Sequence, residues 1–349
     1  MDIYILNQDL EVLDLIDNSS SVIWTPRYYE VGDFEIYIQA SNKNLNLLQE
    51  ERFVTRQDSD MVGIIEKVKV ITDVEDGDYI IASGRCLKSL LARRIIWNQT
   101  NLRGKTEAIM RSLINDNLIN PVNPARKIPN VILGELKGFT ETAEFQSTGE
   151  ELLEKIVELC KSSGIGWKVI LNKIKQIEIE FYKGINRSYS QTENPYIVFS
   201  PEFDNLLATE TEIDTQSLKN VALVAGEGEG TDRTTTTIGT EAGLSRRELF
   251  VDARDLSSNN GEIGVNEYLQ ILKERGIEKL AEAGEFFKVS GEAETKITYK
   301  FGKDYFLGDL VTVVNEYGIT ANTRILEVIE CEDENGYTII PTFEDWRTI

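Results

Sequence analysis

The stretch Val22–Ile38 constrains the fold more than any other part of this sequence. It joins an apolar run to a Pro-Arg break, a turn that contains Gly and Asp, and a segment of alternating residues. The alternation places Phe34, Ile36 and Ile38 on one side and more polar side chains on the other. A period of two residues is typical of a β-strand with one covered face. The N-terminal part of the chain is therefore predicted to be a β-sheet that buries one of its faces.

The charge balance excludes some classes of function. The 349 residues include 37 basic and 59 acidic side chains, which gives a formal net charge of −22. Proteins that wrap nucleic acid draw their affinity from Lys and Arg against phosphates, so this class is disfavoured, although a local basic patch stays compatible with the composition. Simple solubility is an alternative reason for the acidic excess. No apolar run reaches the length of a spanning helix, and the first residues lack the basic flank of a signal peptide.

The chain contains no histidine, and its three cysteines, Cys86, Cys160 and Cys331, are far apart. The missing histidine excludes Ser-His and Cys-His nucleophilic sites and imidazole metal ligands. The cysteine spacing fits neither a zinc site nor a disulfide framework. We expect the three thiols to be buried as small apolar groups, and we expect no cofactor and no metal.

Local patterns predict the order of elements in the first half of the chain. Hairpins are predicted for residues 3–16 and, around Asp76-Gly77, for 62–82. A helix with an apolar stripe is predicted over Thr106–Ile119. A second helix is expected after Thr148, whose spacing to Glu151 is that of a capping box, and Gly164 is expected to end it. The segments 167–171 and 176–182 are expected to pair as strands.

The second half returns to strands. Candidate strands are 205–213, 221–225, 310–314, 323–330 and 337–343, and a helix is predicted over 265–283. The Gly- and Thr-rich segment 226–245 has little apolar surface, so it is interpreted as a mobile loop or a long exposed hairpin. No helix interrupts the last strands, which favours a small closed or partly closed barrel.

The sequence offers no credible catalytic constellation. The Gly104-Lys105-Thr106 run lacks the leading glycine of a phosphate loop, and Asp73–Asp78 lacks the ligand spacing of a calcium loop. Paired carboxylates can cleave glycosidic bonds. In a chain with 59 acidic residues some pair always has a suitable spacing, so such a pair is no evidence for this activity. One mixed-charge cluster surrounds Leu249-Phe250-Val251 and is interpreted either as a solvated strand with ion pairs or as a set of intersubunit contacts. Its members are Arg246, Arg247, Glu248, Asp252, Arg254 and Asp255.

Four separated blocks stand out, and they are Trp24–Glu30 with Gly32–Glu35, Gly84–Leu87 with Leu90–Arg94, Lys219–Ala222 with the following glycines and Arg233, and Arg246–Leu256. These blocks resemble one family, the tail-tip or baseplate hub proteins of siphovirus-type bacteriophages, which form the N-terminal hub module of tail-associated lysin-like proteins. The segment Leu307–Val313 also fits this family.

The resemblance implies a β-rich α+β fold with two β-barrel-like domains and an inserted small α/β domain. The expected boundaries are 1–100 for the first barrel (completed by 186–258), 101–185 for the α/β insert, 259–284 for a linking helix and 285–349 for the second barrel. Three copies are expected to form a ring in which the two barrels alternate, which gives six similar contacts.

The implied function is a structural hub of a phage or prophage tail, assembled in the cytoplasm of the bacterial host and located in the virion tail. Its expected partners are two further copies of itself, the distal tail protein, the tail tube and the tape-measure protein. DNA is expected only in transit, and no membrane insertion is expected. In the family, lytic domains lie in a C-terminal extension, so no enzymatic activity is carried over to this chain. The alternatives are a peptidoglycan hydrolase that uses paired carboxylates and a cell-wall carbohydrate-binding module.

Overall fold

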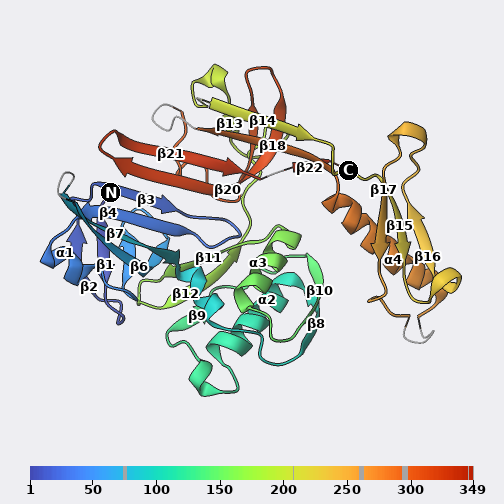
Figure 1. The fold of residues 1–349 in the computed structure, drawn as a ribbon, viewed down its shortest axis with the longest axis horizontal. Helices are drawn as coiled ribbons and strands as arrows, with labels where there is room; N and C mark the ends of the chain where they lie inside the picture. The colour runs from blue at the N-terminus through green and yellow to red at the C-terminus, as the bar shows by residue number, and fades with distance from the viewer. Residues whose placement is uncertain (74–76, 207, 259–262, 293–297, 345, 349) are drawn as a thin grey trace. The chain divides into compact units, whose positions relative to one another are not determined.

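Strands outnumber helices in the computed structural model, which describes residues 1–73, 77–206, 208–258, 263–292, 298–344 and 346–348 (Figure 1). The residues group into two units, which are considered separately. The first comprises Met1–Ala208 and Gly291–Thr342, and the second comprises Thr209–Ser290 and Phe343–Ile349. The predicted β-rich α+β class is confirmed.

The first unit is built on one long series of strands in the order β2-β1-β5-β6-β7-β4-β3-β20-β21. The predicted hairpins are present as β1–β2 and β6–β7, and Asp76 of the second turn lies outside the described residues. The bounds are β1 (Ile3–Leu6), β2 (Val12–Ile16), β3 (Ser21–Thr25), β4 (Asp33–Gln39), α1 (Asn42–Leu47), β5 (Phe53–Arg56), β6 (Val62–Asp73), β7 (Gly77–Cys86), β20 (Thr320–Asp333) and β21 (Gly336–Phe343).

Strand β4 shows the predicted alternation. Phe34, Ile36 and Ile38 are buried, whereas Glu35 between them is exposed. The buried residues pack with Trp24 and with apolar side chains of β1, β5, β6 and β7 in one core. The covered face that the pattern predicted is therefore confirmed.

A bulge bends the β6–β7 pair where the register shifts between Ile65 and Lys67. At this point Gly84 of β7 lies against β6, and a Cβ there would be 1.8 Å from the carbonyl oxygen of Ile64. Only glycine allows such a close backbone approach.

Strand β20 has two sets of partners along its length. Its first part, Thr320–Arg324, pairs with β19 (Leu310–Val314), which also pairs with β13 (Val198–Phe199), and residues 330–332 pair with β3. No described pairing joins β2 back to the other end of the series. Closure of 1–100 and of 285–349 into barrels therefore stays a prediction.

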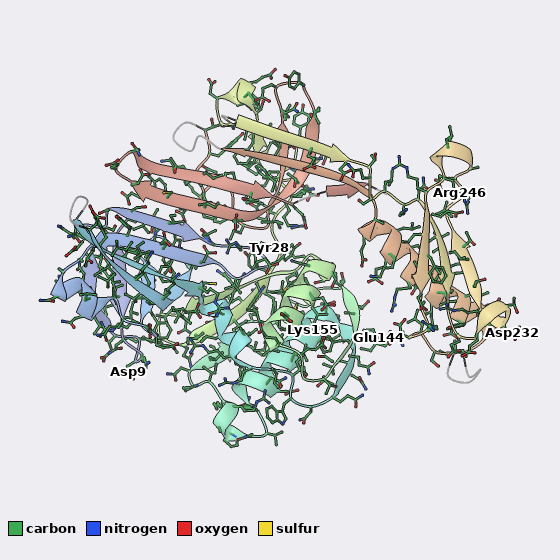
Figure 2. The ribbon with its side chains drawn as sticks, in the orientation of Figure 1. Asp9, Tyr28, Glu144, Lys155, Asp232 and Arg246 are labelled. Atoms are coloured by element: carbon green, nitrogen blue, oxygen red, sulfur yellow. The ribbon has the colours of Figure 1, made fainter. Side chains whose placement is uncertain are left out.

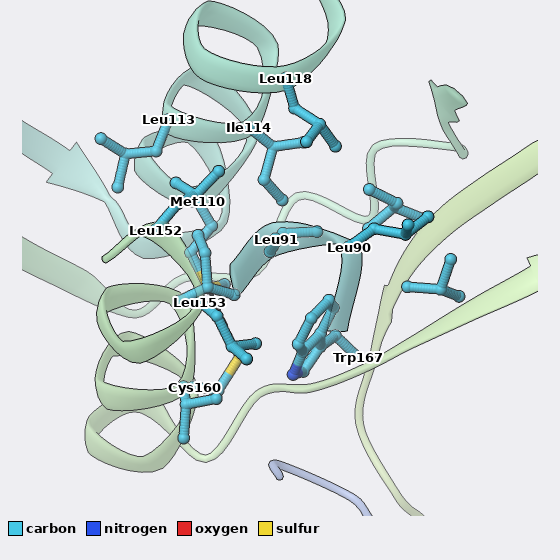
Figure 3. Close-up of a cluster of buried hydrophobic side chains, with 14 of the residues drawn as sticks. Leu90, Leu91, Met110, Leu113, Ile114, Leu118, Leu152, Leu153, Cys160 and Trp167 are labelled. Carbon is cyan, nitrogen blue, oxygen red and sulfur yellow. Dashed lines mark hydrogen bonds between the residues drawn. The ribbon is translucent and has the colours of Figure 1, made fainter. Parts of the chain in front are cut away.

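The insert forms two small sheets and two helices. The predicted 167–171 and 176–182 pair is confirmed, and the helical stripe of 106–119 is buried beside Trp167 (Figure 3). The elements are η1 (Leu87–Arg93), β8 (Thr100–Lys105), α2 (Thr106–Ile114), the π-helical turn η2 (Asn115–Ile119), η3 (Pro124–Arg126), β9 (Val131–Leu133), β10 (Thr142–Ser147), α3 (Leu152–Ser163), β11 (Gly166–Leu171) and β12 (Ile177–Tyr182).

The predicted capping box at Thr148 is wrong. Helix α3 begins after Glu151, which makes no side-chain cap. Glu151 instead forms a β-bridge with Ile95, and the N–H of Leu152 donates to the carbonyl of Arg94 at 3.0 Å. A tertiary contact thus supplies the partner that a capping side chain supplies elsewhere. The predicted end of this helix at Gly164 is confirmed, with φ at 67°.

The second unit places one helix on a three-stranded sheet in the order β16-β15-β17. Val224, Val251, Tyr268, Leu272 and Leu280 form its core with smaller apolar residues. The bounds are η4 (Pro201–Phe203) and β14 (Ala208–Asp214) on the approach to this unit, then β15 (Val221–Ala225), η5 (Gly230–Asp232), β16 (Thr235–Ile238), η6 (Gly243–Ser245), β17 (Glu248–Asp252), α4 (Val265–Glu282), β18 (Glu285–Glu292) and β22 (Trp346–Thr348).

Helix α4 confirms the predicted 265–283 helix. It approaches the sheet so closely that a Cβ at Gly276 would lie 2.3 Å from Ile238 and 2.5 Å from Val224. The helix covers one face of this sheet, and its role as a link between two barrels stays a prediction. Part of the expected 259–284 segment, 259–262, lies outside the described residues.

Candidate assembly interface

The blocks singled out in the sequence come together in two groups. Trp24–Glu30, Gly84–Arg94 and Leu307–Val313 meet in the interior of the first unit. Lys219–Ala222 and Arg246–Leu256 meet in the second unit, where β15 and β17 pair in parallel. The first group explains how the unit holds together, and the second contains the predicted contact residues.

Tyr28 is the centre of the first group. Its ring is fully buried, and its hydroxyl donates to the carbonyls of Gly164 at 3.2 Å and Tyr182 at 3.3 Å. A Cβ at Gly166 would lie 1.9 Å from the ring, and one at Gly308 would lie 2.2 Å from it. The two glycines therefore make the space that Tyr28 occupies. Burial raises the pKa of its phenol.

The backbone around Tyr28 is tied to the C-terminal strands. The N–H of Tyr28 donates to the carbonyl of Leu326 at 2.7 Å, and the guanidinium of Arg324 lies 5.5 Å from the centre of the Tyr28 ring. Arg27 forms ion pairs with Asp33 at 2.5 Å and with Glu327. Residues almost 300 positions apart thus share one contact region, which Figure 2 shows around the label of Tyr28.

The buried lysine Lys88 also binds the loop that contains Tyr28. The ammonium of Lys88 donates to the carbonyls of Arg27, Tyr28 and Glu30 at 2.8, 3.1 and 2.9 Å. It also lies 4.9 Å from the centre of the Trp167 ring, whose Nε1 donates to the carbonyl of Tyr29 at 2.7 Å. No carboxylate of the described residues lies within ion-pair distance of Lys88. The cation is solvated by backbone carbonyls and an aromatic face.

We expect the stability contribution of Lys88 to depend on pH. Burial lowers the pKa of Lys88 to about 8 from an ordinary value of 10.5. Between these pH values the unfolded chain holds a proton that the folded chain has released, so stability rises with pH. The free energy of unfolding, minus that of a Lys88→Met variant, should therefore increase across this window. Urea unfolding at a series of pH values measures the difference, and a constant or falling difference would contradict the assignment.

Asp309 joins the Leu307–Val313 block to the end of the insert. Its carboxylate is buried and accepts from the N–H of Ile185 at 2.7 Å, from Nε of Arg187 at 2.8 Å and from the N–H of Phe306 at 3.1 Å. One side chain therefore connects two segments that are more than 100 residues apart.

The second group presents an uncovered sheet face. Leu223 of β15 and Phe250 of β17 are register partners on the side opposite α4, and they are 44% and 58% exposed. The guanidinium of Arg233 lies 5.8 Å from the centre of the Phe250 ring and pairs with Asp252. We call this surface the β15–β17 face and define it by Leu223, Arg233, Phe250 and Asp252. An apolar centre with charged groups around it is the usual composition of a protein interface.

The structure gives each of the six predicted contact residues a partner. Arg246 pairs with Glu248 at 2.6 Å, Arg254 with Asp252 at 2.6 Å, and Asp255 with Arg275 of α4 at 3.0 Å, while Arg247 donates to the carbonyl of Thr215. The Arg254 and Arg233 guanidiniums lower the pKa of Asp252 to about 2.

The six residues do not form one cluster. Arg246 lies near one end of the sheet (Figure 2), whereas Asp255 contacts helix α4 instead of the β15–β17 face. Leu223, Phe250 and Arg233 were missed as contact residues. The alternation Glu248-Leu249-Phe250-Val251-Asp252 could have placed Phe250 on the charged side of the strand.

Metal ligands, apolar helices and surface depressions are the remaining features of the described part of the chain. No group of three or more Cys, Asp or Glu side chains there could hold a metal ion, and no described helix is long and apolar enough to cross a membrane. Two surface depressions, of about 260 and 460 Å³, lie beside Leu15–Asn18 and beside the side chains of Glu66 and Arg85. Neither includes residues of the 101–185 insert, where the hydrolase alternative places its carboxylates.

The segment 226–245 is an exposed hairpin in part. Residues 235–238 pair with β15, and most of the remaining side chains are exposed. We expect fast backbone amide exchange in the free protein over 228–232 and 239–245, because these residues bury little surface to offset the entropy of ordering. Exchange should slow when the protein assembles. Hydrogen exchange with mass spectrometry measures this, and strong protection in the free chain would contradict it.

Comparison with known proteins gives a consistent result. A family model described as Siphovirus ReqiPepy6 Gp37-like protein matches residues 2–343. A search of curated protein sequences gives no significant match.

Solved structures of tail proteins share the fold over nearly the whole chain. A tail protein from Neisseria meningitidis MC58 has a TM-score of 0.62 at 15% identity, covering 98% of this chain and 96% of that one. The 43 kDa tail protein of prophage MuSo2 from Shewanella oneidensis has a TM-score of 0.61 at 13% identity, covering 99% and 98%. Prophage tail protein gp18 from Listeria monocytogenes EGD-e has a TM-score of 0.57 at 12% identity, covering 98% and 94%.

Proposed function

Because the chain belongs to the Siphovirus ReqiPepy6 Gp37-like family of phage tail proteins, we propose that it is a structural hub at the tail tip or baseplate. In this proposal three copies form a ring that joins the tail tube and distal tail protein to the tip, next to the tape-measure protein. The ring is assembled in the host cytoplasm and becomes part of the virion tail. The observation that carries the proposal is the family match over residues 2–343.

The internal arrangement of the chain supports a ring. A threefold ring that meets a sixfold tube needs two similar contact domains in each copy. We propose that residues 1–100 and residues 285–349 supply them as barrels. Within one copy, strand β3 of residues 1–100 pairs with strand β20 of residues 285–349.

The β15–β17 face is proposed as an intersubunit contact. Its exposed Leu223 and Phe250 would be covered in the ring, and the ion pairs around them would fix the register of the contact. Arg246, Arg247, Glu248 and Arg254 are proposed to lie at the rim of this contact, and Asp255, which pairs with Arg275 of α4, is proposed as an intersubunit contact outside the face.

A double variant tests this face. Leu223→Ser with Phe250→Ser should abolish ring formation, because the apolar centre of an interface carries most of its binding energy. Val70→Ser is the control, since Val70 is 46% exposed on β6 of the other unit. The oligomeric state is measured by light scattering, in the presence of the neighbouring tail proteins if they are required. A ring that persists in the double variant would contradict the assignment.

The proposal assigns the chain no enzymatic activity. Incubation of the purified protein with peptidoglycan tests this point against the hydrolase alternative. Cleavage that is lost on changing one or two carboxylates of residues 101–185 would favour that alternative. A glycan-binding screen tests the carbohydrate-binding alternative in the same way.

We also propose that the channel surface of the ring is net negative and that part of the −22 charge lies there. DNA carries about one negative charge per 1.7 Å of its axis, so a basic lining would hold it and an acidic lining would let it slide. Changing channel-facing acids to lysine should slow DNA ejection at low salt. Ejection at an unchanged rate would contradict this part of the proposal.

A further inference from the structure

The first unit carries a cationic and aromatic surface that is unusual in so acidic a chain. Trp97 is 61% exposed, Val122 is 91% exposed, and the guanidinium of Arg126 lies 5.0 Å from the centre of the Trp97 ring. Arg94 and Lys127 lie next to them in the chain. We call this surface the arginine–tryptophan patch and define it by Arg94, Trp97, Val122, Arg126 and Lys127.

Among the described residues, the cations of this patch have no acidic partner. In the described part of the molecule, no carboxylate lies within ion-pair distance of Arg94, Arg126 or Lys127. The guanidinium of Arg94 donates to the carbonyls of Arg126 at 2.6 Å and Arg93 at 2.7 Å. Burial, together with repulsion from Arg126 and Arg93, lowers the pKa of Arg94. The positive charge of the patch is therefore available to a partner.

The patch is held in place by the π-helical turn η2. Oδ1 of Asn117 in this turn accepts from the N–H of Trp97 at 3.2 Å and from Nη2 of Arg126 at 3.4 Å. Nη2 of Arg126 also donates to the carbonyl of Ile95 at 2.7 Å. Side chains that are already ordered lose less entropy when a partner binds. Single π-turns within helices occur often at functional positions.

The same unit carries a surface of the opposite charge at a different place. The β1–β2 turn and the edge strand β2 expose Asp9, Glu11 and Asp17 together with Val12 and Leu13, which are 60% and 44% exposed. We call this surface the acidic hairpin and define it by these five residues. Figure 2 shows Asp9 at the outer end of the turn.

Hydrogen bonds within the acidic hairpin also hold it in one conformation before any partner binds. Oδ1 of Asn7 accepts from the N–H groups of Asp9 and Glu11, both at 2.9 Å. The edge N–H of Leu15 donates to the carboxylate of Asp14 at 2.8 Å, and Asp14 pairs with Lys43. This cap on the strand edge disfavours the addition of another strand and favours a contact through side chains.

We propose that the arginine–tryptophan patch of one copy binds the acidic hairpin of the next copy. Each surface combines exposed apolar side chains with one sign of charge, and the two surfaces are complementary. Copies that each carry a charge of −22 repel one another, so an attractive contact of opposite charges offsets part of the cost of bringing them together. Because the two surfaces are different, the contact is head-to-tail, and such contacts form a ring when the rotation between successive copies closes.

The inference rests on the proposed ring and is tested separately by charge reversal in the full chain. Arg126→Glu with Lys127→Glu, and separately Asp9→Lys with Glu11→Lys, should each weaken self-association at least tenfold in sedimentation at low salt. The chain that carries all four changes should recover most of the lost affinity, since the charges are then complementary again. Circular dichroism and thermal unfolding confirm that each variant is folded.

Lys173→Glu with Lys175→Glu is the matched control. Both lysines are exposed in the turn between β11 and β12 of the same insert, and the change in net charge equals that of the patch variant. The control should alter self-association less than twofold. An equal loss in the control, no recovery in the fourfold variant, or no association of the unaltered chain at any concentration would overturn the inference. Unchanged self-association with weakened binding of another tail protein would also overturn it, and would identify that protein as the occupant of the patch.

Discussion

Replacing Tyr28 by Ala is expected to destabilise the first unit by about 3–5 kcal/mol, the usual cost of removing a buried aromatic side chain. The ring fills a space that Gly166 and Gly308 leave open, and backbone on both sides cannot collapse easily into the cavity. Urea unfolding followed by tryptophan fluorescence measures the change in the free energy of unfolding.

Two further variants separate the packing of Tyr28 from its hydrogen bonds. Tyr28→Phe keeps the ring and loses the donor to Gly164 and Tyr182, so we expect a loss of about 1 kcal/mol. Tyr317→Ala removes a ring that is 89% exposed and should change stability by less than about 0.5 kcal/mol. A Tyr28→Ala variant as stable as the Tyr317→Ala variant would show that Tyr28 does not organise this interior.

Replacing Asp309 by Ala is expected to cost about 3–5 kcal/mol, because removal of one partner leaves a mostly buried guanidinium without its counter-charge. The affected cation is Arg187, and the N–H groups of Ile185 and Phe306 lose their acceptor as well. Thermal and urea unfolding measure the loss.

The matched comparison is with a carboxylate at the surface. Asp60 pairs with Lys168 at 2.8 Å, but the side chain of Asp60 is 74% exposed, so Asp60→Ala should cost no more than about 1 kcal/mol. Asp309→Asn keeps one acceptor oxygen and should fall between the two. An Asp309→Ala variant with the stability of Asp60→Ala would contradict the role assigned to Asp309.

Features that depend on local periodicity could be predicted from the sequence. The alternation in β4, the hairpin of β6 and β7, and the buried stripe of α2 are confirmed, since neighbouring residues alone determine which side chains share a face. The start of α3 could not be predicted in this way. A bridge to Ile95 sets it, and no capping pattern near Thr148 carries information about that distant segment.

The candidate site was predictable only in part, for the same reason. The charged residues around β17 stand out in the sequence, but Leu223 becomes their neighbour only through the parallel pairing of β15 with β17. Tyr28 belongs to the block Trp24–Glu30, which stands out in the sequence. Its contacts with Gly166, Gly308 and Arg324 depend instead on how three remote segments fold together. The family match adds the biological setting that these contacts alone do not specify.

The number of copies of this chain in a purified tail tests the proposed hub most directly. Quantitative mass spectrometry of intact tails, calibrated on a tail protein of known copy number, gives the value without requiring the free chain to assemble. A ring of this kind predicts three copies in each tail, located at the tip. A count of one or six, or a position along the tube, would contradict it.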